Sequence, residues 1–483
     1  MSTVKGIEKD DILEFRIDDM STDGSGIGHI SLGQADGRGF ALFVKDAAPG
    51  DFVRAKVIRL KKSYGYARLL EVLEPSPDRT EPLCPAARQC GGCQFQHLSY
   101  RAQLDFKKNM VENLLARIGG FEGIKIPPVI GMEDPWHYRN KAQYPVGRDK
   151  NGRTVIGFYA GRTHSIIDLD KYEGAEGCAI QDADSVTIAA ICRQWMESFR
   201  VPAYDEKSGK GLIRHILTRK AFSTGQIMVC LIINGQSLPH ARDLTQALAA
   251  VPGMTSICVS PNKRRDNVIL GERAKTIWGS DTITDYIGDI GYRISPLSFY
   301  QVNPVQTKVL YETALSFADP KEGDTVWDLY CGIGTISLFL AQKAGRVYGV
   351  EIVPQAVEDA RKNAQLNGIE NAVFFTGKAE EVVPREAKKR PDIIVVDPPR
   401  KGCDRSLLDF IIKTGPDRLV YVSCGPATLA RDLKILAEGG YELKKIQCVD
   451  MFPQGCHVEC VVLMSKANTS EALKGVKTSG LWN

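Results

Sequence analysis

One stretch decides the fold of the C-terminal half: Thr325-Val326-Trp327-Asp328-Leu329-Tyr330-Cys331-Gly332-Ile333-Gly334-Thr335, followed by the apolar run 336–341. It reads as a strand, a glycine turn and a helix. Backbone without a Cβ atom approaches a ligand closely, and the start of the helix supplies free N–H groups. Glu351 ends the next predicted strand, where a carboxylate accepts hydrogen bonds from ribose hydroxyls. The stretch therefore predicts a nucleotide-cofactor loop that uses Gly332 and Gly334.

The type of cofactor follows from a missing residue. The loop lacks the third glycine of the G-x-G-x-x-G pattern that dinucleotide enzymes use. The sequence therefore favours S-adenosylmethionine over NAD. Cys331, inside the loop, is interpreted as a small packing residue.

Strands and helices alternate from about Pro320 onward, which predicts an α/β fold with a parallel sheet covered by helices on both faces. The predicted strands are 325–329, 346–351, 392–397 and 418–423, and a helix is predicted over 354–368. Before this region, short alternating segments between Asp11 and Glu74 predict a small β-barrel. The segment 80–291 is interpreted as α+β, with a helix over 100–118. We expect domains at 1–75, 76–295 and 296–466, with a disordered tail at 467–483.

The overall composition is that of an ordinary globular protein. Of 483 residues, 43% are hydrophobic and 25% charged, and 62 Lys and Arg against 58 Asp and Glu give a net charge of +4. This charge alone says little about nucleic acid. The sequence shows no secretory leader, membrane span or sign of an obligate protein partner, so we expect a cytoplasmic protein. Its 13 cysteines then indicate thiols and metal ligands over disulfides.

Two polar motifs follow apolar strands and predict a catalytic pocket. Asp397-Pro398-Pro399-Arg400 and Ser423-Cys424-Gly425-Pro426 each begin at the end of a strand, where open α/β sheets bind ligands. Addition of a thiolate to C6 of uracil makes C5 nucleophilic enough to accept a methyl group, and a base then removes the C5 proton. Cys424 suits the nucleophile. The combination indicates covalent methyl transfer onto a pyrimidine.

The base is sought in the segment His457-Val458-Glu459, which we interpret as part of a strand with His457 and Glu459 on one face. Either residue suits the role. Burial raises the pKa of a carboxylate toward neutrality, which favours Glu459, whereas His457 would orient Glu459 or the substrate.

A second cysteine set lies upstream, at Cys84, Cys90 and Cys93, with Cys178 as the best fourth member. Four thiolates bind zinc or an iron–sulfur cluster, and the spacing alone slightly favours zinc. On the predicted barrel, the decamer 59–68 interleaves basic and aromatic residues. That pattern suits single-stranded RNA, but an ordinary solvated strand explains it nearly as well.

Together these segments resemble the bacterial RNA uracil-C5 methyltransferases of the TrmA/RumA type, and the similarity includes Phe299-Tyr300-Gln301-Val302-Asn303. It implies a Rossmann-like class I methyltransferase domain, an N-terminal OB-like TRAM barrel that binds RNA, and a central α+β domain with a [4Fe–4S] cluster instead of zinc. Cys424 and Glu459 would be nucleophile and base. The implied S-adenosylmethionine site adds four side chains to the glycines: Gln301, Tyr330, Glu351 and Asp397.

The presence of both barrel and cysteine set resembles the branch that makes 5-methyluridine in 23S rRNA more than the tRNA branch. Gly425 and Gly455 depart from the family pattern, which commonly has Asn and Ser or Thr there. Three alternatives stay open: uridine methylation in tRNA, cytosine-C5 methylation, and a non-catalytic RNA-binding or iron-sensing protein.

Overall fold

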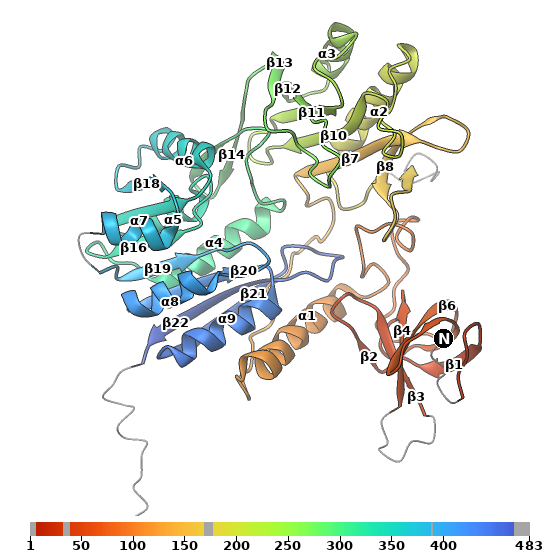
Figure 1. Ribbon diagram of the computed structural model, residues 1–483, viewed down its shortest axis with the longest axis horizontal. Coiled ribbons are helices and arrows are strands. Elements are labelled where there is room, and N and C mark those ends of the chain that lie inside the picture. The colour runs from red at the N-terminus through yellow and green to blue at the C-terminus, as the bar shows by residue number, and fades with distance from the viewer. Residues whose placement is uncertain (1–5, 32–38, 169–176, 388–389, 468–483) are drawn as a thin grey trace, which may run out of the picture.

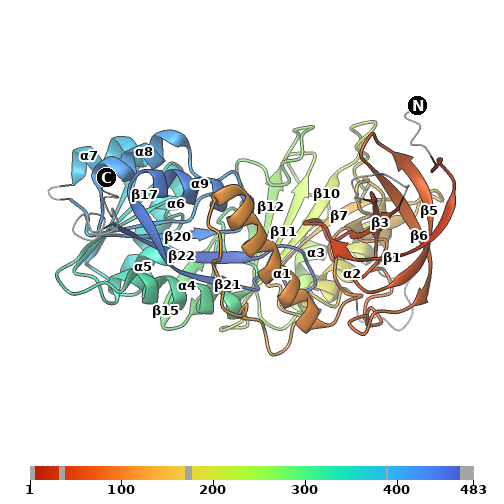
Figure 2. The same cartoon turned by 90° about the horizontal axis from the view of Figure 1, so that it is seen from below.

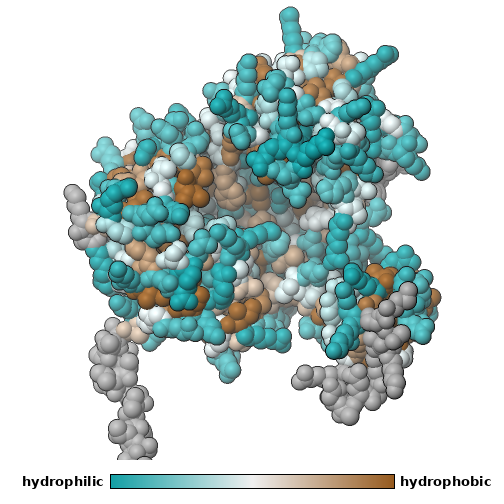
Figure 3. Space-filling model, viewed as in Figure 1, coloured by the Kyte–Doolittle hydropathy of each residue, from teal (hydrophilic) through white to brown (hydrophobic). Residues whose placement is uncertain are grey.

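The computed structural model describes residues 6–31, 39–168, 177–387 and 390–467, in three sheet-based parts (Figure 1). The tail predicted from residue 467 lies outside this range from residue 468 onward. The barrel forms one end of the molecule and the C-terminal sheet the other, with the central sheet between them in the view of Figure 2. Hydrophilic side chains cover most of the face in Figure 3, and the surface is hollowed between the central and C-terminal parts.

The N-terminal part is a six-stranded sheet in the order β1-β5-β6-β4-β3-β2. Alternate side chains of its strands, such as Leu42, Val44, Val53 and Val57, fill one core because successive residues of a strand face opposite sides. The strands are β1 (Ile12–Arg16), β2 (Asp19–Met20), β3 (Gly26–Ile30), β4 (Phe40–Lys45), β5 (Phe52–Leu60) and β6 (Tyr64–Glu74).

The central part is a seven-stranded sheet in the order β13-β12-β11-β10-β7-β8-β9. Two helices, α2 (Ala183–Ser198) and α3 (Ala241–Ala249), pack their apolar faces on one side of it. The strands are β7 (Lys141–Arg148), β8 (Thr154–Tyr159), β9 (Ile166–Asp168), β10 (Ile213–Lys220), β11 (Ile227–Ile233), β12 (Met254–Pro261) and β13 (Lys275–Gly279).

The C-terminal sheet has the order β18-β17-β16-β19-β20-β22-β21, and the hairpin β14 (Ile283–Ile287) and β15 (Ile290–Ile294) precedes it. The strands run parallel except β22, which is antiparallel to both of its neighbours. They are β16 (Thr325–Leu329), β17 (Arg346–Glu351), β18 (Ala372–Thr376), β19 (Ile393–Val396), β20 (Arg418–Ser423), β21 (Tyr441–Val449) and β22 (Glu459–Lys466).

Helices cover both faces of this sheet, as the sequence predicted. One apolar cluster joins one face to α4 (Pro304–Ala318), α5 (Thr335–Ala341) and α6 (Pro354–Leu366). A second cluster joins the other face to α7 (Ala379–Glu386), α8 (Arg405–Thr414) and α9 (Pro426–Glu438). The helix predicted over 100–118 is α1 (Tyr100–Leu114), continued by one π-helical turn, Leu115–Gly119. It belongs to the second cluster and lies beside α9, far away in the sequence (Figures 1 and 2).

Candidate active site

The predicted site residues gather at one edge of the C-terminal sheet. Strands β16, β17, β19 and β20 are parallel, so their carboxyl ends meet at the same edge. Glu351 ends β17, and the segments that follow the other three strands carry the glycine loop, Asp397 and Cys424. Glu459 reaches this edge from β22, whose antiparallel register pairs Cys460 with Ser423. The sheet thus brings together a loop, a thiol and several carboxylates.

The glycine loop is held in a conformation that most residues avoid. The backbone φ angle is 98° at Tyr330, 54° at Gly332 and 84° at Gly334. A Cβ atom on Gly334 would lie 3.1 Å from the Phe374 ring, whereas one on Gly332 would meet no atom within 4 Å. The absence of a Cβ atom at Gly334 therefore lets the loop pack closely against Phe374. Gly332 leaves open space beside the loop, which a ligand can enter.

Glu351 fastens this loop to the end of β17. Its Oε2 accepts a hydrogen bond from the N–H of Gly332 at 3.2 Å, and its Oε1 accepts one from the N–H of Val353 at 3.0 Å. The N–H groups of Tyr330 and Cys331 donate to the carbonyl of Val350 at 3.0 and 3.1 Å. The loop is therefore positioned before any ligand binds.

Asp328 is a residue of the site that the sequence reasoning did not single out. Burial raises the pKa of its carboxyl to about 7, and the charge of Glu351 acts in the same direction. Its Oδ2 accepts a hydrogen bond of 2.6 Å from Ser337 Oγ, while its buried Oδ1 has no partner among the described residues. A free buried acceptor beside a glycine loop suits a polar cofactor. Its position as the last polar residue of a buried strand was the available signal.

Cys424 lies half-buried between the end of β20 and the start of α9, where Gly425 is the N-cap residue. Burial raises the pKa of its thiol to about 11, and the negative charges of Glu459 and Asp397 raise it further, while Arg400 opposes them. Glu459, Asp397 and Arg400 can shift the pKa of the Cys424 thiol because their side chains lie near it. The sulfur is therefore a thiol in the free protein at neutral pH.

Glu459 is 3% exposed, and burial raises the pKa of its carboxyl to about 8. The charge of Asp397 also raises this pKa, and Arg400 lowers it. The pKa of Asp397 is itself raised to about 7, first by burial and then by Asp328. A pKa near the working pH suits a group that accepts a proton during a reaction.

The structure corrects one interpretation of this segment. His457 does not share a strand face with Glu459, because β22 begins only at Glu459 and His457 lies exposed before it. Partial loss of solvent around its ring, followed by the charges of Arg400 and Lys107, lowers the pKa of His457. The Glu459 carboxylate, and not the imidazole, is among the charges that shift the pKa of Cys424.

The loop before Glu459 is anchored by α1. Lys107 Nζ and Asp450 Oδ1 form an ion pair of 2.6 Å in which both side chains are 0% exposed. Tyr100 donates from its hydroxyl to Asp450 Oδ2 at 2.9 Å, and Lys107 also donates to the carbonyl of Phe452 at 3.0 Å. A helix of the central segment thus fixes the approach to Glu459.

Gln301 lies in the loop that leads into α4. The backbone carbonyl of Gln301 accepts a hydrogen bond of 2.9 Å from Asn140 Nδ2, and Asn303 Nδ2 donates to the carbonyl of Met451 at 3.2 Å. The loop therefore lies between β7 and the segment before Glu459. Phe299, in the same loop, is 72% exposed.

The cysteine set brings two distant segments together. Burial raises the pKa of the Cys178 thiol to about 12, and Cys90 and Cys84 contribute in the same direction. Cys93 is affected likewise, by burial and then by Cys178, Cys90 and Cys84. The four thiols therefore lie within electrostatic reach of one another. Within the described ranges, however, no three or more His, Cys, Asp or Glu side chains are arranged to hold a metal ion.

Three rings form an aromatic group on the barrel. The centroids of Phe43, Tyr64 and Tyr66 are separated by 5.6 to 5.7 Å. The rings are half-buried, so part of each face is open to solvent. Two of them belong to the basic and aromatic decamer noted in the sequence.

Comparison with known proteins matches two parts of the chain to family models. Residues 274–467 match the model described as tRNA (Uracil-5-)-methyltransferase, and residues 11–70 match that of the TRAM domain. None of the helices in the described part of the chain is long and apolar enough to cross a bilayer.

Relatives match over nearly the whole length. A protein of Halalkalibacterium halodurans is 48% identical over 96% of this chain and 98% of its own, and one of Clostridium acetobutylicum is 48% identical over 97% and 100%. Both carry the name uncharacterized RNA methyltransferase. The crystal structure of Pyrococcus abyssi tRNA (uracil-54, C5)-methyltransferase in complex with S-adenosyl-L-homocysteine is 28% identical, with a TM-score of 0.73 over 94% of this chain and 100% of that one.

These similarities confirm the predicted fold class, a class I methyltransferase fold with an N-terminal TRAM domain. The relatives that are 48% identical over nearly their whole length carry the name RNA methyltransferase, and the family model that matches residues 274–467 is that of a tRNA (Uracil-5-)-methyltransferase. The chain therefore belongs to the family of S-adenosylmethionine-dependent RNA uracil-C5 methyltransferases.

Proposed function

We propose that this enzyme methylates uridine at C5 through a transient bond between Cys424 Sγ and C6 of the base. The observation that carries the proposal is the placement of a half-buried thiol, a buried carboxylate of raised pKa and the glycine loop at one sheet edge. S-adenosylmethionine supplies an electrophilic methyl group on a sulfonium. Gly332, Gly334, Tyr330, Glu351, Asp397 and Gln301 would hold it, and Asp328 adds an acceptor.

The reaction balances with the groups of the chain. The Cys424 thiol releases its proton to solvent and the thiolate adds to C6, which leaves C5 as the carbon of an enolate. C5 would then attack the methyl carbon of S-adenosylmethionine, the bond from methyl to the sulfonium would break, and S-adenosylhomocysteine would be the leaving group. The Glu459 carboxylate accepts the C5 proton, the C6–S bond breaks, and the Cys424 thiolate is restored.

The proton on Cys424 must leave before the first step. Its pKa of about 11 in the free protein disfavours the thiolate. A positive sulfonium near the sulfur and the N-terminus of α9 both favour the charged form. We therefore infer that a bound cofactor lowers the pKa of Cys424.

Methylation of unmodified RNA tests this function. Purified protein, labelled S-adenosylmethionine and transcripts of 23S rRNA and of tRNA should give 5-methyluridine, and Cys424→Ala should give none. Label recovered in 5-methylcytidine would favour the cytosine-C5 alternative. Cofactor binding without any transfer to RNA would favour a non-catalytic protein.

We infer 23S rRNA as the main substrate, because barrel and cysteine set occur together in this chain. The second candidate is tRNA, the substrate of the Pyrococcus abyssi tRNA (uracil-54, C5)-methyltransferase. Mapping 5-methyluridine in both RNAs, from cells with and without the gene, separates the two. Either RNA places the enzyme in the cytoplasm, and we infer no obligate protein partner.

We propose further that Cys84, Cys90, Cys93 and Cys178 hold a [4Fe–4S] cluster. Each thiolate of such a cluster binds a different iron, so the sulfurs stand farther apart than around a single zinc ion. The mutual effect of these thiols on one another's pKa supports a shared site for the four. Anaerobically purified protein should be brown and contain about four irons per chain. Colourless protein with bound zinc would contradict the cluster.

The barrel is proposed to bind RNA through its aromatic group. Bases of any sequence stack on aromatic rings, and basic side chains nearby neutralise the backbone. Phe43, Tyr64 and Tyr66 offer such rings on one patch.

We propose the domain limits 1–75, 76–295 and 296–466 for the three parts.

A further inference from the structure

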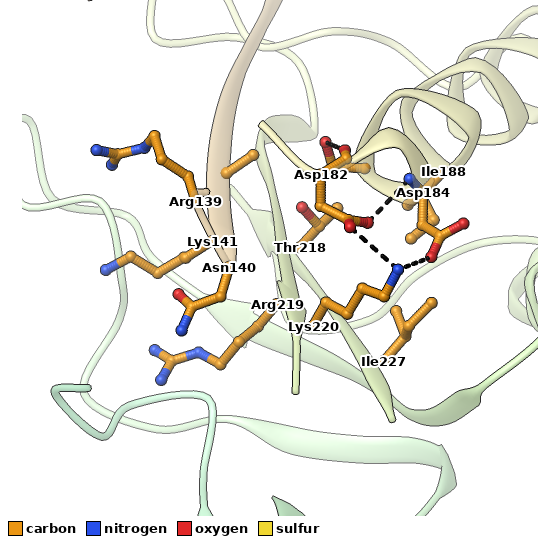
Figure 4. A pocket seen from close by; sticks show the side chains of 12 residues that line it. Arg139, Asn140, Lys141, Asp182, Asp184, Ile188, Thr218, Arg219, Lys220 and Ile227 are labelled. Carbon is orange, nitrogen blue, oxygen red and sulfur yellow. Dashed lines mark hydrogen bonds and ion pairs between the residues drawn. The ribbon is translucent and has the colours of Figure 1, made fainter. Parts of the chain in front are cut away.

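One face of the central sheet carries three positive side chains. Lys141 on β7 and Arg219 on β10 are directly opposite in the antiparallel register, so their side chains leave the sheet on the same face. Arg139 comes two residues before Lys141, and its side chain points to the same side in Figure 4. We call Arg139, Lys141 and Arg219 the cation cluster.

The nearby acids lie on the other side of the strands. Asp182 and Asp184 are bound by Lys220 Nζ, at 3.0 and 2.7 Å, and these three side chains point away from the cation cluster in Figure 4. In the portion of the chain that the structure describes, no ion pair joins a carboxylate to a member of the cluster. Among the residues that the structure describes, these three cations therefore share one region with no carboxylate paired to them.

The two arginines act on the ionisation of Lys141. Burial lowers the pKa of Lys141 to about 8, and the charges of Arg219 and Arg139 lower it further. Burial also lowers the pKa of Arg219, to about 10. Like charges held together cost free energy, and an anion bound between them would remove that cost.

Two members of the cluster are positioned by the protein. Arg219 is 3% exposed, and its Nη2 donates to the carbonyl of Ser298 at 3.0 Å. Its buried Nε has no partner among the described residues. The Gln181 side chain has an amide orientation in which its oxygen accepts from Arg139 Nε at 3.1 Å and its nitrogen donates to the carbonyl of Lys141 at 3.0 Å. The cluster is thus built into the sheet, unlike surface side chains that move freely.

The cluster adjoins the active site. Asn140, between Arg139 and Lys141, donates from its side chain to the carbonyl of Gln301 at 2.9 Å and from its backbone to that of Val302 at 2.8 Å. Tyr138 donates to the carbonyl of Pro453, in the loop before Glu459, at 2.9 Å. Arg219 donates to the carbonyl of Ser298, and the next residue in the chain is the exposed Phe299. The cations therefore stand beside the loops that frame the site.

We propose that the cation cluster binds a backbone phosphate of the RNA strand next to the uridine that enters the active site. A base that reacts inside a pocket leaves its stack, and the backbone on either side stays at the entrance. Arginine forks match phosphate oxygens, and lysine adds a point charge. This inference rests on the proposed action on RNA. It adds the contact that holds the strand while the base is turned out.

The test measures RNA affinity against salt concentration for Lys141→Gln and Arg139→Gln, with the unmodified 23S rRNA transcript as probe. Each variant should bind roughly tenfold more weakly, and the slope of log K against log salt should fall by about one. Lys141→Arg, which keeps the charge, should restore most of the affinity. The matched control is Lys150→Gln, which removes one exposed charge beyond the other end of β7 and should change neither quantity.

Binding of S-adenosylmethionine should be the same in all four variants, which shows that the fold and the cofactor site are intact. A salt slope and affinity equal to wild type in both Gln variants would overturn the proposal. This failure is distinct from failure of the proposed function, since the latter would appear as wild-type protein that transfers no methyl group. Reduced slopes in a protein without transfer activity would support the phosphate site and refute only the reaction.

Discussion

At the scale of single residues, the reaction depends on when Cys424 and Glu459 hold a proton. Both pKa values are raised, to about 11 and about 8, because the groups are buried beside other acids. The raised pKa of Cys424 keeps its sulfur protonated until a positively charged cofactor binds. The raised pKa of Glu459 lies close to neutral pH, where this residue can accept and release a proton. Gly425 directly follows Cys424 and is the N-cap residue of α9. A Cβ there would lie 2.7 Å from Thr428 Oγ1 and 3.0 Å from the carbonyl of Arg400, so the asparagine common in the family needs a small shift of both.

Replacement of the base should separate the two halves of the reaction. Glu459→Gln removes proton acceptance at C5 while leaving Cys424 in place, so we expect methyl transfer to fall by about 100-fold or more and the covalent intermediate to accumulate. Turnover and adduct are measured on the same RNA. The control Glu438→Gln changes an exposed carboxylate on α9 and should leave both unchanged. Undiminished turnover in Glu459→Gln would remove this residue from the mechanism.

The same variant should be more stable than wild type in alkaline solution. Glu459 has a pKa of about 8 when folded and an ordinary value of 4.5. The folded state thus binds this proton more tightly, and wild type loses stability as the pH rises from about 4.5 to about 8. Glu459→Gln has no such loss. At pH 9 its free energy of unfolding, measured by chemical denaturation, should therefore exceed that of wild type by on the order of 1–4 kcal/mol. Equal stability of the two proteins at pH 5 and pH 9 would contradict the raised pKa.

At the scale of elements, α1 supports a site to which it contributes no reacting group. It packs beside α9 and anchors the loop before Glu459 through Lys107 and Tyr100. The sequence predicted this helix and the strands of the α/β sheet, because apolar periodicity and glycine turns are local signals. It did not predict that α1 docks on the C-terminal sheet. Such a contact joins residues 343 positions apart and leaves no local pattern.

Breaking this anchor should cost both stability and activity. Lys107→Met leaves Asp450 buried without its cation, which we expect to destabilise the protein by about 3–5 kcal/mol in chemical denaturation. The added change Asp450→Asn removes the uncompensated charge and should recover part of the loss. Lys108→Met, one residue along, removes a partly exposed lysine whose partner Glu112 is 3.7 Å away, and should cost far less. Equal effects of the two lysine changes would refute the anchoring role.

At the scale of the whole molecule, the barrel and the C-terminal sheet lie at opposite ends, and the loops that frame the reacting groups contact the central segment through Asn140 and Tyr138. The sequence placed Cys424, Asp397 and Glu351 correctly at strand ends, since strand termini are readable from apolar runs. It placed His457 wrongly, because alternation alone does not show where β22 begins. It also missed Asp328 and the cation cluster. To recognise these residues, one must know which side chains lie next to them on the neighbouring strands. The register between strands determines those neighbours, and the sequence of a single strand does not show it.

The barrel should raise affinity without taking part in chemistry. Tyr66→Ala removes one ring of the aromatic group, and we expect RNA binding to weaken by about tenfold while kcat at saturating RNA stays unchanged, since one stacked base contributes about 1–3 kcal/mol. Tyr286→Ala, an exposed tyrosine on β14, is the control and should leave affinity unaltered. Should kcat fall and affinity hold in Tyr66→Ala, the barrel would have a different role.

The central claim is the bond between one sulfur and the base, and trapping with RNA that contains 5-fluorouridine tests it most directly. Fluorine at C5 cannot be removed as a proton, so the methylated adduct persists and mass spectrometry identifies the peptide that carries the nucleotide. The account predicts that the modified peptide contains Cys424 and that Cys424→Ala forms no adduct. An adduct on another residue, or equal trapping by Cys424→Ala, would contradict it.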